Sequence, residues 1–450
     1  MKRRTFTTLT ALLLVFSLIL CGCDTLGTIS EEPLPLPESS SDISSEESSL
    51  GTLSEIPEGT LSSGSGSTSS ENLSTPTVKN NLKIKAVWIE YTDAVFQKNS
   101  KEKYINLVTE RFTNIKNSGF NTVFYHVRAN ADAIYKSEYF PYSEKLTGVQ
   151  GKDPGYDGLK IAIDIAHGLG LEIHAWVNPY RVSAFSDDVT KLCENHIARI
   201  WRTDGNPETD SYVIPWNGKL YFNPASSEVQ KLIINGICEI LQNYNVDGIH
   251  FDDYFYPTSD INFDIGSYAK YSLSAKYPLS QADWRRANVD TLVTNVYNLV
   301  KGYNREFGIS PAYTISNDHT DRNYNEAYIN LKKWLGNSGY VDYLLPQLYF
   351  GYEHKLSTAR FDYILNLWCG MKRVDTVKLY IGLPAYKIGL NNASDLSEWA
   401  EKDDILARQY LDCENKKVDG ISIYNYSSFF SDKELHKKQR ENFLCEMNGE

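Results

Sequence analysis

The segment VDGIHFDDYFYP, residues 246–257, places two carboxylic acids, Asp252 and Asp253, directly after a run of apolar residues. A pair of carboxyl groups can cleave a glycosidic bond: one donates a proton to the leaving oxygen, and the other, ionised, stabilises or attacks the anomeric carbon. The two states need different surroundings, because burial raises the pKa of a carboxyl group and a nearby cation lowers it. The pair therefore indicates acid–base chemistry on a sugar.

Further polar and aromatic side chains stand where other apolar runs end. Residues two apart on a strand share a face, so His250 is expected on the side of Asp252, and Arg128 on the side of His126. We expect that Asp252 meets Arg128 or His250 or else that its pKa is raised, and that the remaining groups orient a bound sugar. The candidates for substrate binding are Glu90, His126, Arg128, Trp176, Asn178, His250, Gln347 and Tyr349.

A metal site is an alternative hypothesis, because His and Asp at strand ends are the ligands of barrel metallohydrolases. The histidines in question are His126, His174 and His250. Such a site needs an HxH pair on one strand, and the sequence has none. We therefore expect neither a metal nor a cofactor. Glu90 and Asp318 are further candidates for the proton donor.

Regular elements must bring these residues together. From about residue 82, apolar runs of strand length alternate with longer segments of helical periodicity. Eight such units predict a TIM (β/α)8 barrel with extended loops after strands 2, 3 and 4, and a doubly wound open sheet is the alternative. The expected strands are 84–90, 122–128, 172–178, 248–253, 309–316, 343–350, 378–384 and 420–426, and the expected helices 101–117, 158–169, 227–244, 281–303, 326–336, 361–371, 402–413 and 433–444.

One short motif recurs just before the predicted strands. VDGI occurs at 246–249 and again at 418–421, and VDY at 341–343 is a looser form. The working residues of a barrel lie at the opposite, C-terminal ends of the strands. We interpret Asp247, Asp342 and Asp419 as turn or capping groups at the lower rim.

The chain begins with a segment of a different character. Lys2, Arg3 and Arg4 precede an apolar run, and LCGC at 20–23 resembles a bacterial lipobox, so residues 1–23 are predicted to be a lipoprotein signal peptide with Cys23 as the lipidated residue. A plain secretory signal is the alternative. Residues 24–80, rich in Ser and Glu, predict a disordered linker, and 81–450 the catalytic domain. The expected location is the extracellular face of the cell membrane, through a lipid anchor.

Charge and cysteine content exclude other classes of function. The formal net charge is −12, whereas a nucleic-acid partner would need a basic face. The cysteines after Cys23 show no CxxC pairing, so they indicate neither a zinc site nor a disulfide framework.

With these residues in hand, the chain resembles bacterial glycosyl hydrolase-like family ten, extracellular lipoproteins with a TIM-barrel domain. The resemblance implies a glycoside hydrolase acting on a polysaccharide, with cell-wall glycan as the expected polymer. It adds Asp132 and Arg181 to the expected substrate-binding residues. It spans roughly 83–444 and rests on AVWIE at 86–90, HVR at 126–128 with DA at 132–133 and Tyr135, HAWVNPYR at 174–181, the stretch 246–257, and LPQLY at 345–349.

The segment DGIHFD, 247–252, is also similar to the fourth-strand motif of the α-amylase clan, whose last Asp is the nucleophile. The similarity favours Asp252 as the central carboxylate. His250 stands where that clan has Arg, and 312–316 holds no Glu to act as the acid. Asp253 is the first choice for the proton donor, with Asp318 and Glu90 as alternatives.

Three other mechanisms or functions stay open. In a substrate-assisted reaction, an N-acetyl group of the sugar attacks while Asp252 and Tyr349 orient it. A carbohydrate-binding protein without turnover would keep the pocket and lack the chemistry. A metal-dependent hydrolase or deacetylase would lose activity with a chelator.

Overall fold

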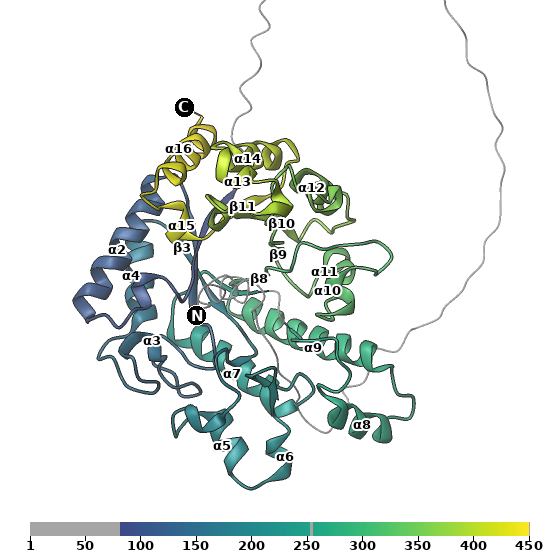
Figure 1. Ribbon diagram of the computed structural model, residues 1–450. Coiled ribbons are helices and arrows are strands. Elements are labelled where there is room, and N and C mark those ends of the chain that lie inside the picture. Colours follow the sequence, from purple (N-terminus) through teal and green to yellow (C-terminus); the bar gives the residue numbers. More distant parts are fainter. Residues whose placement is uncertain (1–81, 253–254, 450) are drawn as a thin grey trace, which may run out of the picture. The chain divides into compact units, whose positions relative to one another are not determined.

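The computed structural model describes residues 82–252 and 255–449. The predicted signal peptide, the linker at 24–80, Cys23 and Asp253 lie outside the described residues. Eight parallel strands close into a barrel, with helices around it (Figure 1). The predicted TIM (β/α)8 architecture is therefore confirmed. In order around the barrel the strands are β1 (Ile84–Ile89), β2 (Thr122–Arg128), β3 (Glu172–Val177), β7 (Gly248–Phe251), β8 (Glu306–Ile309), β9 (Tyr343–Leu344), β10 (Lys378–Pro384) and β11 (Gly420–Tyr424).

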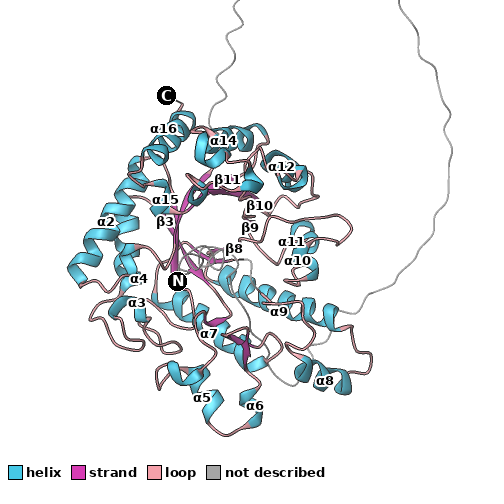
Figure 2. Ribbon diagram, viewed as in Figure 1, coloured by secondary structure: helices cyan, strands magenta, loops and turns pink. Residues whose placement is uncertain are grey.

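Helices surround the strands, and further short elements extend from the barrel (Figure 2). The main helices are α2 (Lys101–Asn117), α4 (Gly158–Gly168), α7 (Ser227–Asn243), α9 (Gln281–Gly302), α11 (Leu331–Gly336), α12 (Phe361–Cys369), α14 (Ile405–Asn415) and α16 (Glu434–Asn448). The shorter ones are α3 (Glu144–Thr147), α5 (Ile197–Thr203), α6 (Pro207–Asp210), α8 (Ile265–Ser274), α10 (Arg322–Asn325), α13 (Glu398–Glu401) and α15 (Tyr426–Phe429). The chain between β3 and α7 forms a separate antiparallel sheet. Its strands lie in the order β4 (Arg181–Ser183), β6 (Lys219–Phe222), β5 (Val213–Trp216).

Side-chain caps fix where several helices begin. The Ser100 side chain accepts from the backbone N–H of Lys103 at the start of α2, and Asp157 accepts from Lys160 at the start of α4. These bonds satisfy backbone donors that have no partner within the helix. Among residues 82–252 and 255–449, no helix combines the length and the apolar character that a membrane span requires.

The inside of the barrel is filled by large aromatic rings. Trp88, Phe124, Trp176, Tyr343 and Tyr380 form one buried cluster there. Glycines on the neighbouring strands leave room for two of the rings packed in the barrel. A Cβ built on Gly308 would overlap the ring of Tyr343, and one on Gly248 would overlap His174.

The aspartates of the repeated motif cap backbone N–H groups at the lower rim, as the sequence predicts. Asp247 accepts the backbone N–H of Ile173 at 2.8 Å, Asp342 that of Phe307 at 2.8 Å, and Asp419 that of Leu379 at 2.9 Å. Each also contacts a basic side chain: His167 of α4, Lys301 of α9, and Arg373 of the loop between α12 and β10, in turn. Each Asp thus ties its own strand to the strand before it.

The predicted boundaries fail where proline interrupts a strand. The fifth strand, expected at 309–316, is Glu306–Ile309, because Pro311 has no N–H to donate to a sheet. The sixth, expected at 343–350, is assigned only at Tyr343–Leu344, with Pro346 two residues on. The eighth ends at Tyr424, since Tyr426 already begins α15.

Candidate functional site

Aromatic rings line the C-terminal mouth of the barrel around Tyr424, the last residue of β11. Its ring stacks on Tyr349, with centroids 5.6 Å apart and planes at 24°, and meets the edges of Trp88 and Tyr386 at 5.7 and 5.8 Å. Trp176 lies edge-on at 6.5 Å. Trp176 and Tyr349, both expected to bind substrate, thus each contact Tyr424, and their role in substrate binding stays a prediction.

A carboxylate is held within this aromatic wall. Glu90 follows β1, and its Oε2 accepts from the Tyr424 hydroxyl at 2.5 Å. Its Oε1 accepts from Nδ2 of Asn425 at 2.7 Å and from the Thr92 hydroxyl at 2.8 Å. Burial, followed by the negative charge of Glu90, raises the pKa of Tyr424 well above its ordinary value, so the hydroxyl keeps its proton. Three donors therefore fix the orientation of the Glu90 carboxylate.

His126 lies beside this wall, 2 % exposed. Its Nδ1 accepts from the backbone N–H of Tyr91 at 3.4 Å, and its ring packs on Trp176. Burial, and then the charge of Arg181, lower the pKa of His126 well below its ordinary value. The ring is accordingly neutral at pH 7.

Tyr91 is a site residue that the sequence reasoning missed. The guanidinium of Arg181 lies 5.4 Å and the Lys145 ammonium 5.6 Å from its ring centroid. Its ring also meets the edge of His126 at 5.4 Å. Its position directly after Glu90, at the end of the first strand, could have identified Tyr91 as a site residue from the sequence.

His250 lies one layer deeper, fully buried beneath the mouth. The indole N–H of Trp88 lies 3.4 Å from its Nε2. Because an indole can only donate, Nε2 accepts and Nδ1 carries the proton, which it donates to the Tyr343 oxygen at 3.0 Å. The Tyr343 hydroxyl can then donate to Nδ1 of His174, also at 3.0 Å. His250 supports Trp88 from below, in place of the direct sugar contact expected from the sequence.

The pKa values agree with this one-way chain of hydrogen bonds. Burial lowers the pKa of His250 well below its ordinary value, and the nearby His174 adds to this effect. Burial also lowers the pKa of His174 to about 4. Both rings are neutral at pH 7, as the chain requires.

Asp252 directly follows β7 and is 8 % exposed. It lies at the same end of the barrel as Glu90, since both follow the C-terminal ends of parallel strands. The pairing of Asp252 with Asp253 lies outside the described residues and stays a prediction.

The structure does not place Arg128 in the mouth. The pairing of β2 with β3 shifts between His126 and Arg128, and this irregularity turns Arg128 toward the helical layer. Its guanidinium lies 4.2 Å from the Phe140 ring centroid, and a Cβ on Gly236 of α7 would come within 2.7 Å of it. The expectation that Arg128 shares the face of His126 is wrong because simple alternation breaks at this bulge.

Other predicted residues brace the loops around the mouth. Asn178 and Arg181 both donate to the carbonyl of Ala129, at 3.2 and 2.9 Å, and Gln347 donates to the carbonyl of Ser310 at 3.2 Å. These bonds tie neighbouring upper loops together. Direct substrate contacts by these side chains stay predictions.

Two more acids occupy different environments. Asp132, buried in the loop after β2, accepts from Gln150 at 3.1 Å, and burial raises its pKa to about 6. Asp318 is exposed, and hydrogen bonds with Thr320 and Ser316 lower its pKa. An exposed acid with a lowered pKa is poorly suited to donate a proton at neutral pH, which counts against Asp318. In the part of the chain that the structure describes, no three His, Cys, Asp or Glu side chains gather closely enough to hold a metal ion.

Comparison with known proteins identifies the family and agrees with the fold. The model of the family described as glycosyl hydrolase-like 10 matches residues 83–401. The chain is 34 % identical over 375 residues to glycosyl hydrolase YngK of Bacillus subtilis, covering 79 % of this chain and 69 % of that protein. It is 33 % identical over 294 residues to glycosyl hydrolase DigH of Escherichia coli, covering 62 % of this chain and 65 % of that protein.

Solved structures share the fold at low sequence identity. The glycoside hydrolase domain of PgaB from Bordetella bronchiseptica matches with a TM-score of 0.51 at 12 % identity, covering 81 % of this chain and 98 % of that one. The catalytic domain of beta-amylase from Paenibacillus polymyxa matches with a TM-score of 0.51 at 8 % identity, covering 82 % and 99 %. These two similarities concern the barrel alone.

Proposed function

Because this chain belongs to the glycosyl hydrolase-like 10 family, we propose that it hydrolyses glycosidic bonds of a polysaccharide at the mouth of its barrel. The observation that carries this proposal is the fixed carboxylate of Glu90 within an aromatic wall, at the same end of the barrel as Asp252. Aromatic faces bind the apolar faces of sugar rings, and carboxylates bind their hydroxyl groups or stabilise positive charge.

The two described carboxylates suit different roles. Both oxygens of Glu90 accept hydrogen bonds, so this carboxylate is arranged to hold a sugar hydroxyl or a developing positive charge. Asp252 takes the central role, as the nucleophile or as the carboxylate that stabilises an oxocarbenium-like centre. Asp253 remains the first choice for the proton donor on its position in the sequence.

We also propose that Cys23 carries a lipid and that the substrate is cell-wall glycan. The sequence supports this: a linker of roughly 55 residues has an average reach of about 40 Å, so a tethered barrel would act on polymers next to the membrane. A Cys23→Ala variant should move from the membrane fraction to the medium or the soluble fraction. A variant that stays in the membrane would contradict lipid anchoring without affecting the proposed chemistry.

The catalytic proposal is tested by counting the reducing ends released from purified wall glycan strands and from a panel of plant glycans. Asp252→Asn is expected to lower the rate at least 100-fold, because the amide cannot carry the charge that the reaction needs. Asp318→Asn is the matched control and should keep the wild-type rate, since that side chain is exposed on a turn. An unimpaired Asp252→Asn would refute the assigned role. Retention of glycan without release of reducing ends by the wild type would identify a binding protein.

A further inference from the structure

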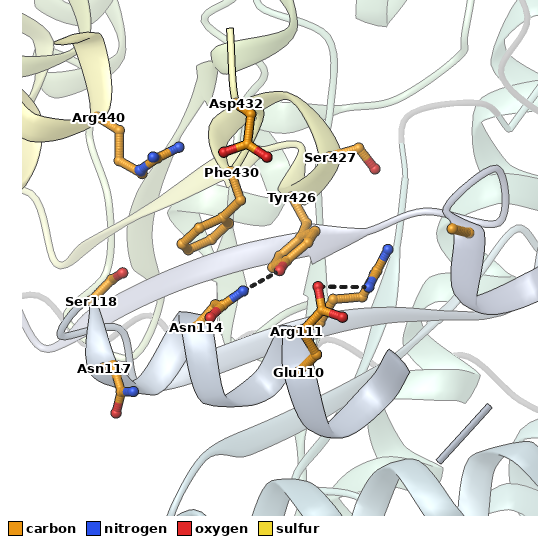
Figure 3. Close-up of a pocket in the computed structure, with 11 residues that line it drawn as sticks. Glu110, Arg111, Asn114, Asn117, Ser118, Tyr426, Ser427, Phe430, Asp432 and Arg440 are labelled. Atoms are coloured by element: carbon orange, nitrogen blue, oxygen red, sulfur yellow. Dashed lines mark hydrogen bonds and ion pairs between the residues drawn. The ribbon is translucent and has the colours of Figure 1, made fainter. Parts of the chain in front are cut away.

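A groove lies on the outer wall of the barrel, away from the aromatic mouth. It runs between the C-terminal half of α2 and the stretch 426–440, which holds α15 and the first half of α16 (Figure 3). Its volume is about 590 Å³, within the usual range for small-ligand sites. The lining residues are Ala94, Glu110, Arg111, Asn114, Asn117, Ser118, Tyr426, Ser427, Phe430, Asp432 and Arg440.

Charged side chains of both signs line the groove. Two acids and two arginines line it, and both arginines are already engaged. Arg111 donates from Nε to Asp93 at 2.6 Å, and Arg440 donates to the carbonyls of Phe429 and Ser431 at 2.8 and 3.2 Å. An anion would meet two carboxylates and a cation two guanidiniums, so the groove favours a neutral ligand.

The remaining lining offers polar groups beside the half-buried ring of Phe430, while Tyr426 is only 4 % exposed. Asn114 donates to the Tyr426 hydroxyl at 2.9 Å, and the Tyr426 ring stacks on Phe430 with centroids 4.6 Å apart. Asn117 and Ser118 add an amide and a hydroxyl at the end of α2. Donors, acceptors and an apolar surface side by side match the alternating hydroxyl groups and C–H faces of a sugar chain.

The groove and the mouth share one short stretch of chain. Tyr424 and Asn425 hold Glu90, while the next two residues, Tyr426 and Ser427, line the groove. Ser427 in turn donates to Asp93 at 2.7 Å, which fixes the groove floor to the loop after β1. A ligand in the groove would therefore lie at a set position relative to the mouth.

We propose that this groove is a second glycan-binding site, which holds a neutral segment of an oligosaccharide outside the catalytic mouth. Binding there would keep a polymer near the mouth and raise its effective concentration. The proposal does not require turnover at the mouth.

Hydrogen exchange of the full chain, with cellotetraose and chitotetraose as neutral probes, tests the site directly. Either probe at millimolar concentration should slow exchange in 110–118 and 426–432, both in the wild type and in Asp252→Asn. Asn117→Arg fills the groove with a long cation at an exposed helical position, and should reduce this protection at least fivefold. Protection elsewhere, at the mouth, should persist in this variant.

Thr109→Arg is the matched control, because it adds the same side chain to α2 at an exposed position that does not line the groove. It should keep the wild-type protection, and thermal melts should show all variants folded. Absence of protection at 110–118 and 426–432 with both tetraoses would overturn the proposal, as would equal protection in Asn117→Arg. Because the readout is local, a failure here is distinguishable from a failure to release reducing ends.

Discussion

The indole of Trp176 lies flat on the imidazole of His126, with ring centroids 3.6 Å apart and planes 13° apart. This contact helps keep water from a titratable ring beside the mouth. Since desolvation disfavours the charged form of an imidazole, the pair presents a neutral aromatic surface rather than a cation. A neutral sugar ring approaching Glu90 would therefore meet no competing positive charge from His126.

Trp176→Ala should expose His126 and raise its pKa toward the ordinary value of about 6.5. The lost packing should also lower the free energy of unfolding by about 3–5 kcal/mol. NMR titration of the His126 ring measures the first effect, and denaturant unfolding the second. Trp201→Ala, which removes a ring packed on Tyr212 and Phe222, is the control and should leave the His126 pKa in place. An unchanged His126 pKa in Trp176→Ala would show that Trp176 does not shield it.

Tyr424→Phe removes the hydroxyl that donates to Glu90 and keeps the ring. A hydrogen bond to a charged group contributes about 1.5–3 kcal/mol, so kcat/KM for glycan hydrolysis should fall roughly 10- to 100-fold. Tyr386→Phe keeps the neighbouring ring and serves as the control, with a rate close to that of the wild type. Equal rates for the two variants would argue against a functional role for the bond between Tyr424 and Glu90.

Asp419→Ala removes the acceptor of the Leu379 backbone N–H at the start of β10 and the ion pair with Arg373. Leaving a buried donor unsatisfied costs about 1–3 kcal/mol. The free energy of unfolding in urea should fall by that amount, while hydrolysis under native conditions stays near the wild-type rate. Asp375→Ala, at an exposed position just before the same strand, should cost little. Comparable losses for both variants would contradict the strand-tying role.

His196 makes stability depend on pH. It is fully buried, its Nδ1 accepts from the Ala198 backbone at 3.1 Å, and burial lowers its pKa to about 3. Below about pH 6.5 the unfolded chain therefore binds a proton that the folded ring does not, and stability falls by about 1.4 kcal/mol per pH unit. The raised pKa of Asp132 makes the folded state more stable as the pH falls, which opposes the effect of His196. A variant that removes only the His196 titration is therefore needed to separate the two effects.

His196→Asn keeps an N-cap acceptor and removes the titration. Between pH 6 and 4, the free energy of unfolding should fall less steeply in this variant than in the wild type. The two slopes should differ by about 1.4 kcal/mol per pH unit. Urea unfolding across this range measures the difference. His319→Asn, at a half-buried loop position far along the chain from His196, is the control and should follow the wild-type curve. Parallel curves for wild type and His196→Asn would contradict the buried, neutral state of His196.

Periodicity was sufficient to predict the barrel, because each strand of a parallel barrel is a short apolar run followed by a helix. The lower-rim aspartates were predictable for the same reason, since the motif recurs at one place in the architecture. Arg128 was not, because alternation assumes regular pairing and β2 has a bulge at that point. The small sheet formed by β4, β5 and β6 was also missed, since strands of three or four residues carry too few side chains to show a period.

The depth of each site residue was harder to predict than its identity. His250 and Asp252 share a face in sequence, yet the strand ends at Phe251, so the two side chains belong to different layers. Two of the three donors that hold Glu90, Tyr424 and Asn425, come from residues more than 300 positions away in the chain. Their partnership depends on ring closure between the first and last strands, which local pattern does not encode.

The overlap that a Cβ on Gly308 would make with the Tyr343 ring has an evolutionary consequence. Neither position can change freely alone: a side chain at 308 would displace Tyr343, and a smaller residue at 343 would leave a void and break the contacts with His250 and His174. Related barrels should therefore vary at these two positions together, trading a small residue in one strand against a large one in the next.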